Sequence, residues 1–199
     1  MTNAPTPVGN NGLSAGAAQS GIRLNRRLLA LTGFMGCGKS TVARLLARQI
    51  GWIHSDLDKR IVTQASLTIP EIFAQLGEPA FRRIEHEELE RILGEATATG
   101  KPTIVSLGGG TVAQSANTEL LQKSGCATVW LQCSVEELIQ RCSHITDRPL
   151  FKDEASFRQL YKERLPFYEL ARYRVESSVE PLRVVQSIIA LGILDGVPQ

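Results

Sequence analysis

The stretch GFMGCGKS, residues 33–40, decides the fold class of this chain. It matches the pattern G-x-x-x-x-G-K-[ST], which is the sequence of a phosphate-binding loop (P-loop) when a strand precedes it and a helix follows it. The apolar run RLLALTG (27–33) has the length and composition of a buried strand. The segment KSTVARLLARQIG (39–51) repeats apolar residues on one helical face and ends on a glycine. We therefore expect this chain to bind a nucleoside triphosphate.

The residue types in this loop suit the phosphates of a nucleotide. Glycines let backbone N–H groups turn toward a phosphate, and the following helix directs its positive N-terminal end to the same place. Lys39 is expected to reach the outer phosphates, and the Ser40 hydroxyl to ligate Mg²⁺. A glycine-rich turn that carries GKS by coincidence is the alternative, but it leaves the flanking strand and helix unexplained. Cys37 is either a thiol whose pKa the helix N-terminus lowers or, as we favour, a small filler whose backbone N–H is the functional group.

Beyond this loop, apolar runs typical of strands alternate with amphipathic helical segments. Four further strands are predicted at residues 52–56, 102–110, 126–134 and 172–178. Helices are predicted at residues 69–77, 78–97, 116–125, 134–143, 157–171 and 181–194, the fifth of them interrupted by Pro166. This alternation indicates an α/β fold of three layers, with a five-stranded parallel sheet between helices. In such sheets ligands bind outside the carboxyl ends of the strands.

The length and charge of the chain narrow its function further. Its 199 residues suit a single domain, and 22 Lys plus Arg against 20 Asp plus Glu predict no nucleic-acid partner. No apolar run approaches the roughly 20 residues that span a bilayer, so no membrane partner is expected. The four cysteines fit neither a metal motif nor a secreted disulfide framework, which favours reduced thiols in a cytoplasmic protein.

The chain is expected to consist of a tail followed by one domain. Residues 1–21 have no charged side chain and little hydrophobic bulk, which predicts a disordered N-terminal tail over residues 1–24. They lack the basic start and apolar centre of a signal peptide, and an organelle transit peptide is the minor alternative. Residues 25–199 form the single domain, in which a break in the helical pattern predicts a lid over approximately residues 142–158.

Scattered arginines distinguish a small-molecule kinase from other P-loop proteins. The guanine-reading string N-K-x-D of switch proteins is absent from the sequence. FRRIE (81–85) offers two arginines at a helix start, of which one is expected to be a solvated residue paired with glutamate. SLGGGT (106–111) follows an apolar strand and either allows the close approach of a ligand or is a flexible turn. Arginines also stand in DRPL (147–150) and KERLPFY (162–168), where they would neutralise a charged acceptor and the migrating phosphoryl group.

Together with SDLDKRI (55–61) and GEPAFRRIE (77–85), these motifs occur in an order and spacing that resemble the shikimate kinase family over residues 27–195. The resemblance implies a fold like that of nucleoside monophosphate kinases, with strand order 2-3-1-4-5. It implies a monomer that uses ATP and Mg²⁺ to phosphorylate the 3-hydroxyl of shikimate, on the route to chorismate and aromatic amino acids.

Each matching position then acquires an implied role in the acceptor site. Asp58 would bind the acceptor hydroxyls and act as the base, and Asp56 would support Mg²⁺ together with Ser40. Arg82 and Arg164 would hold the shikimate carboxylate, and the backbone of Gly108, Gly109 and Gly110 would contact shikimate. An extended strand end would place Asp56 and Asp58 on one face, since residues i and i+2 share it.

The resemblance also implies the nucleotide contacts. ATP would be bound by Gly36, Cys37, Gly38, Lys39, Ser40, Thr41, Arg141 and Arg148. Among these, Lys39 and Arg148 would also be catalytic, Arg148 by reaching the phosphoryl group as the lid closes, while Arg141 would lie over the adenine. The run CSHITD (142–147) departs from the more basic or glycine-rich family pattern, which leaves the hinge and basicity of the lid open.

Two other functions remain as alternatives. One is a P-loop kinase for another small hydroxylated acid or sugar, such as gluconate, which would be expected to have lost the two carboxylate-binding arginines or the triple glycine, and both are present. The other is a nucleotide-binding regulatory module, which would be expected to have lost Lys39, Asp58 or Arg148, all of which are present.

Overall fold

The computed structural model describes residues 24–143 and 153–196. The strands are β1 (Asn25–Thr32), β2 (Ile53–Asp56), β3 (Thr103–Ser106), β4 (Cys126–Gln132) and β5 (Tyr173–Glu176). The helices are α1 (Lys39–Ile50), α2 (Leu57–Ala65), α3 (Ile69–Gln75), α4 (Gly77–Thr99), α5 (Ser115–Lys123), α6 (Val135–Cys142), α7 (Glu154–Tyr168) and α8 (Pro181–Ala190), with a short 3-10 helix η1 (Thr111–Ala113).

The five strands form one parallel sheet in the order β2-β3-β1-β4-β5. The central strand β1 carries the run Leu28–Leu31, which is buried because both faces of the sheet are covered. The register places Leu31 beside Ser106 and Ser106 beside Asp56, so β1, β3 and β2 end at one level. The predicted α/β class and strand order are confirmed.

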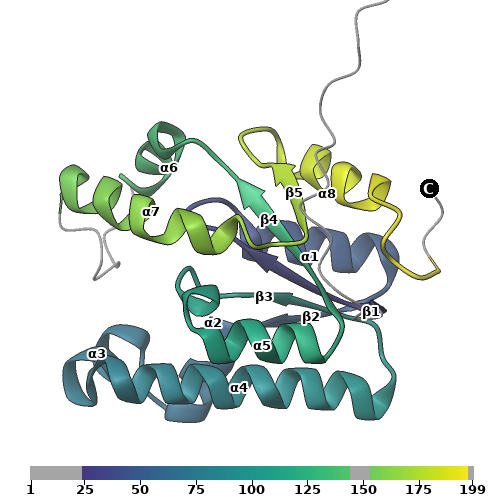
Figure 1. Cartoon of the computed structure of the whole chain (residues 1–199), viewed down its shortest axis with the longest axis horizontal. Helices are drawn as coiled ribbons and strands as arrows, with labels where there is room; N and C mark the ends of the chain where they lie inside the picture. Colours follow the sequence, from purple (N-terminus) through teal and green to yellow (C-terminus); the bar gives the residue numbers. More distant parts are fainter. Residues whose placement is uncertain (1–23, 144–152, 197–199) are drawn as a thin grey trace, which may run out of the picture.

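Helices cover the sheet in two layers (Figure 1). Helices α1 and α8 contact each other on one face, and α4 and α5 contact each other on the other. This division follows from right-handed crossovers, because α1 leads from β1 to β2 in one direction and α5 leads from β3 to β4 in the opposite direction. Helix α7 packs on α6 and against η1, next to the glycine run that follows β3.

Two local predictions were wrong. Asp56 and Asp58 do not share one face of a strand end, because β2 ends at Asp56 and α2 begins at the next residue. Asp56 is the N-cap of α2 and Asp58 lies in its first turn, so the chain turns between them. Helix α7 continues through Pro166, where an interruption was expected.

The predicted tail and lid lie largely outside the described residues and remain predictions. Of the expected tail over residues 1–24, only Leu24 is described, and β1 begins at the following residue. Of the expected lid, Cys142 ends α6 and residues 154–158 open α7, while residues 144–152 lie outside the described residues.

Within the described part of the chain, no helix is long and apolar enough to cross a membrane. All four cysteines are free and buried, and burial raises the pKa of Cys126 to about 12.

Candidate active site

The P-loop closes tightly around its own lysine. Lys39 Nζ donates to the carbonyl oxygens of Gly33 and Phe34 at 2.9 and 3.0 Å. Gly38 is the N-cap of α1 with φ of 92°, a left-handed conformation that glycine adopts without steric cost. No side chain caps this helix and no acidic residue lies in its first turn. Its N-terminal N–H groups and positive end are therefore suited to an anion.

The remaining P-loop residues separate into buried and exposed positions. The Cys37 side chain is buried beneath the loop, where a β-carbon built on Gly33 would lie 2.9 Å from its Sγ. A β-carbon on Gly36 would lie 2.6 Å from Cys142 Sγ, so the loop packs directly against the end of α6. Ser40 and Thr41 are exposed in the first turn of α1. The buried thiol fits the interpretation of Cys37 as a filler.

Asp56 is held in place by two donors at the end of β2. Its Oδ1 accepts the backbone N–H of Lys59 at 3.2 Å, and its Oδ2 accepts the hydroxyl of Ser106 at 3.1 Å. Ser106 Oγ lies 3.0 Å from His54 Nε2, which is the donor to it because the Ser106 proton is given to the carboxylate. Burial lowers the pKa of His54, against the opposing attraction of Asp56.

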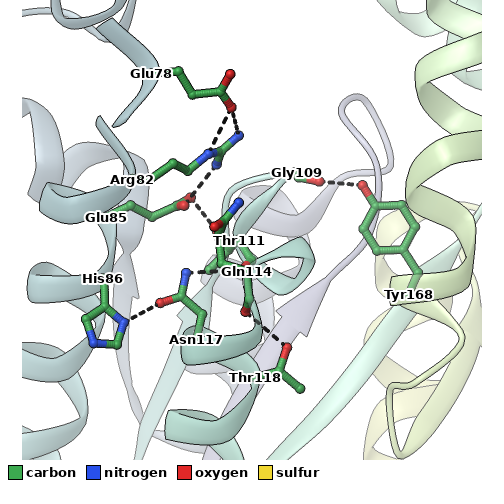
Figure 2. A network of polar contacts seen from close by, with 10 residues as sticks. All are labelled: Glu78, Arg82, Glu85, His86, Gly109, Thr111, Gln114, Asn117, Thr118 and Tyr168. Carbon is green, nitrogen blue, oxygen red and sulfur yellow. Dashed lines mark hydrogen bonds and ion pairs between the residues drawn. The ribbon is translucent and has the colours of Figure 1, made fainter. Parts of the chain in front are cut away.

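Arg82 is fixed by two carboxylates of its own helix (Figure 2). Its Nη1 donates to Glu85 Oε2 at 2.9 Å, and its Nη2 donates to Glu78 Oε1 at 3.0 Å. Burial alone lowers the pKa of Arg82, but the attraction of Glu85 and its hydrogen bond outweigh this, so the pKa stays raised. Arg83 has a side chain 71% exposed and lies 4.0 Å from Glu87, which confirms that one arginine of this pair is a solvated residue.

The glycine run brings the acceptor-site candidates together. A β-carbon built on Gly110 would lie 2.9 Å from Arg82 Nη2 and 3.2 Å from Arg164 Nη2. A β-carbon on Gly108 would lie 3.0 Å from Asp58 Oδ1. Two guanidinium groups and a carboxylate thus converge on a backbone that carries no side chains. The structure brings Asp58, Arg82 and Arg164 to the same glycine run.

Helix α7 supplies the other side of this place. The Arg164 guanidinium lies 5.9 Å from the centre of the Phe34 ring, in the P-loop. The Tyr168 hydroxyl donates to the carbonyl oxygen of Gly109 (Figure 2). The Tyr168 ring is buried and stacks on Trp130. Burial raises the pKa of Tyr168 well above its usual value, so the phenol remains a donor. The glycine run is therefore tied to α7 as well as to α4.

Of the two remaining candidate arginines, the structure describes one. Arg141, in the last turn of α6, donates from Nη2 to the Ser177 carbonyl oxygen at 3.1 Å and pairs with Glu137 at 2.8 Å. This attaches α6 to the segment between β5 and α8. Arg148 lies outside the described residues.

Sequence reasoning missed Glu85, Thr111 and Tyr168. Glu85 follows Arg82 by three positions, a spacing that places the two side chains together on a helix and could have revealed the pair. The hydroxyl of Thr111 donates to Glu85 Oε1 at 2.7 Å, across a separation of 26 residues that no local pattern encodes. Tyr168 contacts Gly109 across 59 residues, which also depends on the tertiary fold.

The P-loop follows the central strand, and residues 108–110 lie between this loop and the two arginines. This arrangement is that of a P-loop kinase that acts on a small acceptor. A family model described as shikimate kinase matches residues 35–191. The chain therefore belongs to the shikimate kinase family.

Individual relatives agree with this assignment. A shikimate kinase of Geobacter metallireducens is 40% identical over 173 residues, which cover 85% of this chain and 93% of the relative. One of Methylococcus capsulatus is 41% identical over 158 residues, covering 77% and 84%. The structure of shikimate kinase from Acinetobacter baumannii in complex with shikimate has a TM-score of 0.76 at 33% identity and covers 85% and 94% of the two chains. A gluconokinase from Sinorhizobium meliloti, at 22% identity and a TM-score of 0.55, shares the fold.

Proposed function

We propose that this chain transfers the γ-phosphoryl group of ATP to the 3-hydroxyl of shikimate. The observation that carries this proposal is the convergence of Arg82 and Arg164 on Gly110, within the same run in which Asp58 approaches Gly108. Shikimate has one carboxylate and several ring hydroxyls, so it requires a cationic end and an anionic end in its site. A carboxylate favours guanidinium partners because the two planar groups can pair through two hydrogen bonds.

In this proposal each end of the acceptor has its own partners. Arg82 and Arg164 bind the carboxylate, and the backbone of Gly108, Gly109 and Gly110 lies along the ring because no side chain obstructs it. Asp58 accepts a hydrogen bond from the reacting hydroxyl and receives its proton as the hydroxyl oxygen bonds to the γ-phosphorus of ATP and the bond from that phosphorus to ADP breaks, which releases ADP. The substrate is thereby held with its hydroxyl at the P-loop end.

The nucleotide occupies the P-loop in the same proposal. The N–H groups of Gly36, Cys37, Gly38, Ser40 and Thr41 surround the phosphates, and Lys39 exchanges its bonds to loop carbonyls for phosphate oxygens. Arg141 lies over the adenine beside the segment that follows β5. Arg148 closes over the phosphoryl group and excludes water, which would otherwise accept the phosphate.

The residues at the metal position fit Mg²⁺ in a particular way. In the described part of the chain, no group of three His, Cys, Asp or Glu side chains could hold a metal ion alone. Mg²⁺ commonly keeps several waters and binds through one or two protein oxygens plus substrate phosphates. Asp56 and Ser40 supply a carboxylate and a hydroxyl of this kind, with Asp56 oriented by Ser106. When bound, the ion would neutralise charge on the β- and γ-phosphates.

A small panel of acceptors tests the proposal. The purified chain with ATP and Mg²⁺ is expected to release ADP when shikimate is added, and not when gluconate or a nucleoside monophosphate is added. Turnover with gluconate and none with shikimate would reject the acceptor assignment while retaining the kinase class. We further propose that the chain is a cytoplasmic monomer; the four free cysteines support the reducing compartment. Sedimentation in solution tests the monomer.

A further inference from the structure

We propose that Thr111 is a positioning residue for the acceptor, acting through Glu85 on Arg82, and this inference rests on the proposed function. The Thr111 hydroxyl donates to Glu85 Oε1 at 2.7 Å, while the other oxygen of the same carboxylate accepts from Arg82 at 2.9 Å (Figure 2). Thr111 and Arg82 therefore hold opposite oxygens of one carboxylate. Arg82 contacts the substrate in the proposed function, whereas Thr111 would not.

Burial makes this contact consequential. Thr111 is fully buried and the Glu85 side chain is 1% exposed, so water cannot easily replace a lost donor. A buried carboxylate oxygen deprived of its partner keeps its full desolvation penalty, and the side chain is expected to rotate to recover one. Rotation of Glu85 would carry the Arg82 guanidinium with it. Because a β-carbon on Gly110 would already lie 2.9 Å from Arg82 Nη2, a small displacement of this group changes the shape of the acceptor site.

A second hydrogen bond, at the backbone of Thr111, also holds this residue in place. Its carbonyl oxygen accepts from Asn117 Nδ2 at 3.1 Å, and Asn117 is fully buried. Asn117 Oδ1 in turn lies 2.7 Å from Nδ1 of His86, the residue that follows Glu85 on α4. Two adjacent residues of α4 thus hold Thr111, one at its hydroxyl directly and one at its carbonyl through Asn117 (Figure 2).

Thr111 and Glu85 together set the distance between α4 and the glycine run. Thr111 donates its backbone N–H to the carbonyl oxygen of Gly108 at 3.3 Å. A β-carbon on Gly108 would lie 3.0 Å from Thr111 Oγ1 and 3.1 Å from Glu85 Oε1, so both groups rest against this glycine. Asp58 approaches the same glycine from α2. The hydroxyl of Thr111 consequently keeps the arginine of α4 in register with the backbone that shikimate would contact.

The test compares Thr111→Val, which keeps the shape and removes the hydroxyl, with Thr111→Ser, which keeps the hydroxyl. Calorimetric titration with shikimate is expected to show about tenfold weaker binding for Thr111→Val, equivalent to about 1.4 kcal/mol. Binding by Thr111→Ser should stay near the wild-type value, and ATP binding should be unchanged in both. Thr103→Val is the matched control, since Thr103 is also buried and its hydroxyl donates to Lys101 O, far from the glycine run.

A double substitution separates positioning from general stability. In an Arg82→Lys background, Thr111→Val should weaken shikimate binding much less than it does in the wild type, because the two residues act through one carboxylate. Equal effects in both backgrounds, wild-type shikimate binding by Thr111→Val, or parallel losses of shikimate and ATP binding would overturn the inference. If Thr111→Val does not fold, Thr111→Ala removes the same hydroxyl and carries the same test. Failure of the wild-type chain itself to bind shikimate would reject the proposed function, and the inference with it.

Discussion

Arg82 and Glu85 lie one turn apart on α4, and the Arg82 Nη1 to Glu85 Oε2 distance is 2.9 Å, with the glutamate side chain 1% exposed. Long arginine side chains lose considerable rotamer freedom when they bind a ligand. Glu85 holds the Arg82 guanidinium beside the glycine run, so for a ligand that binds there part of that cost is already met. In the proposed function, a buried carboxylate of the protein thus organises the site for the carboxylate of the substrate.

Arg82→Lys should weaken shikimate binding by about tenfold or more, although the charge is retained. An ammonium group offers no planar pair of donors and cannot satisfy Glu85 and a substrate carboxylate in the same geometry. Shikimate titrations measure the effect. Arg83→Lys is the matched control on the exposed side of the helix and should leave binding unchanged. If Arg82→Lys bound shikimate as tightly as the wild type does, Arg82 would not be a residue of the acceptor site.

Gly110→Ala should leave the fold intact and raise the KM for shikimate by roughly ten- to a hundredfold. Gly110 has φ of −115°, which alanine adopts freely, so the backbone is not strained. The new methyl group would meet the guanidinium groups of Arg82 and Arg164, which would have to shift and would then no longer face the acceptor. Steady-state kinetics measure the KM for shikimate, and thermal unfolding tests whether the fold is intact.

Gly94→Ala provides the control for this substitution. Gly94 lies within α4 and a β-carbon there would contact nothing within 4 Å. Alanine at this helical position should raise the free energy of unfolding by about 0.5–1 kcal/mol and leave KM unchanged. A Gly110→Ala variant with normal kinetics would mean that the acceptor does not lie against this glycine.

Two buried threonines should respond oppositely to valine. Within residues 24–143 and 153–196, Thr32 Oγ1 is a buried side-chain atom without a hydrogen-bond partner. Thr32→Val should therefore leave the free energy of unfolding unchanged or raise it by up to about 1 kcal/mol. Thr111→Val should lower it by about 1–3 kcal/mol, because Glu85 loses a donor. Denaturant unfolding compares them, and a loss of stability in Thr32→Val would reveal a partner for its hydroxyl.

The capping box at the start of α3 should make stability depend on pH. Hydrogen bonds from the Thr68 hydroxyl and backbone lower the pKa of Glu71 from its ordinary value of 4.5. A carboxyl group with a lowered folded-state pKa stabilises the fold above its unfolded pKa and loses that contribution as the pH falls through the folded value. Thr68→Ala should therefore lower the melting temperature at pH 7, and the difference from wild type should shrink at pH 3. A difference that does not change with pH would show that Glu71 does not contribute through its charge.

The sequence predicted the features that short motifs carry, and it missed side-chain contacts between residues far apart in the chain. The P-loop came from a motif of fixed spacing, whereas the strand order and the residues Asp58, Arg82 and Arg164 came from the resemblance to the shikimate kinase family. The structure has that strand order and brings those three side chains to one glycine run. The face shared by Asp56 and Asp58 was wrong because Asp56 caps a helix that starts at the next residue. Thr111 and Tyr168 were not found because their partners, Glu85 and Gly109, are far away in the chain.

The most direct test of the central claim is the pair of measurements, shikimate-dependent ADP release and ATP binding, in wild type and Asp58→Asn. The amide keeps the size of the side chain but cannot accept the hydroxyl proton as a base. We predict that the wild type releases ADP only with shikimate, and that Asp58→Asn loses this release by at least about a hundredfold while it still binds ATP. ADP release by Asp58→Asn at the wild-type rate would contradict the role given to Asp58, and no release by the wild type would contradict the function itself.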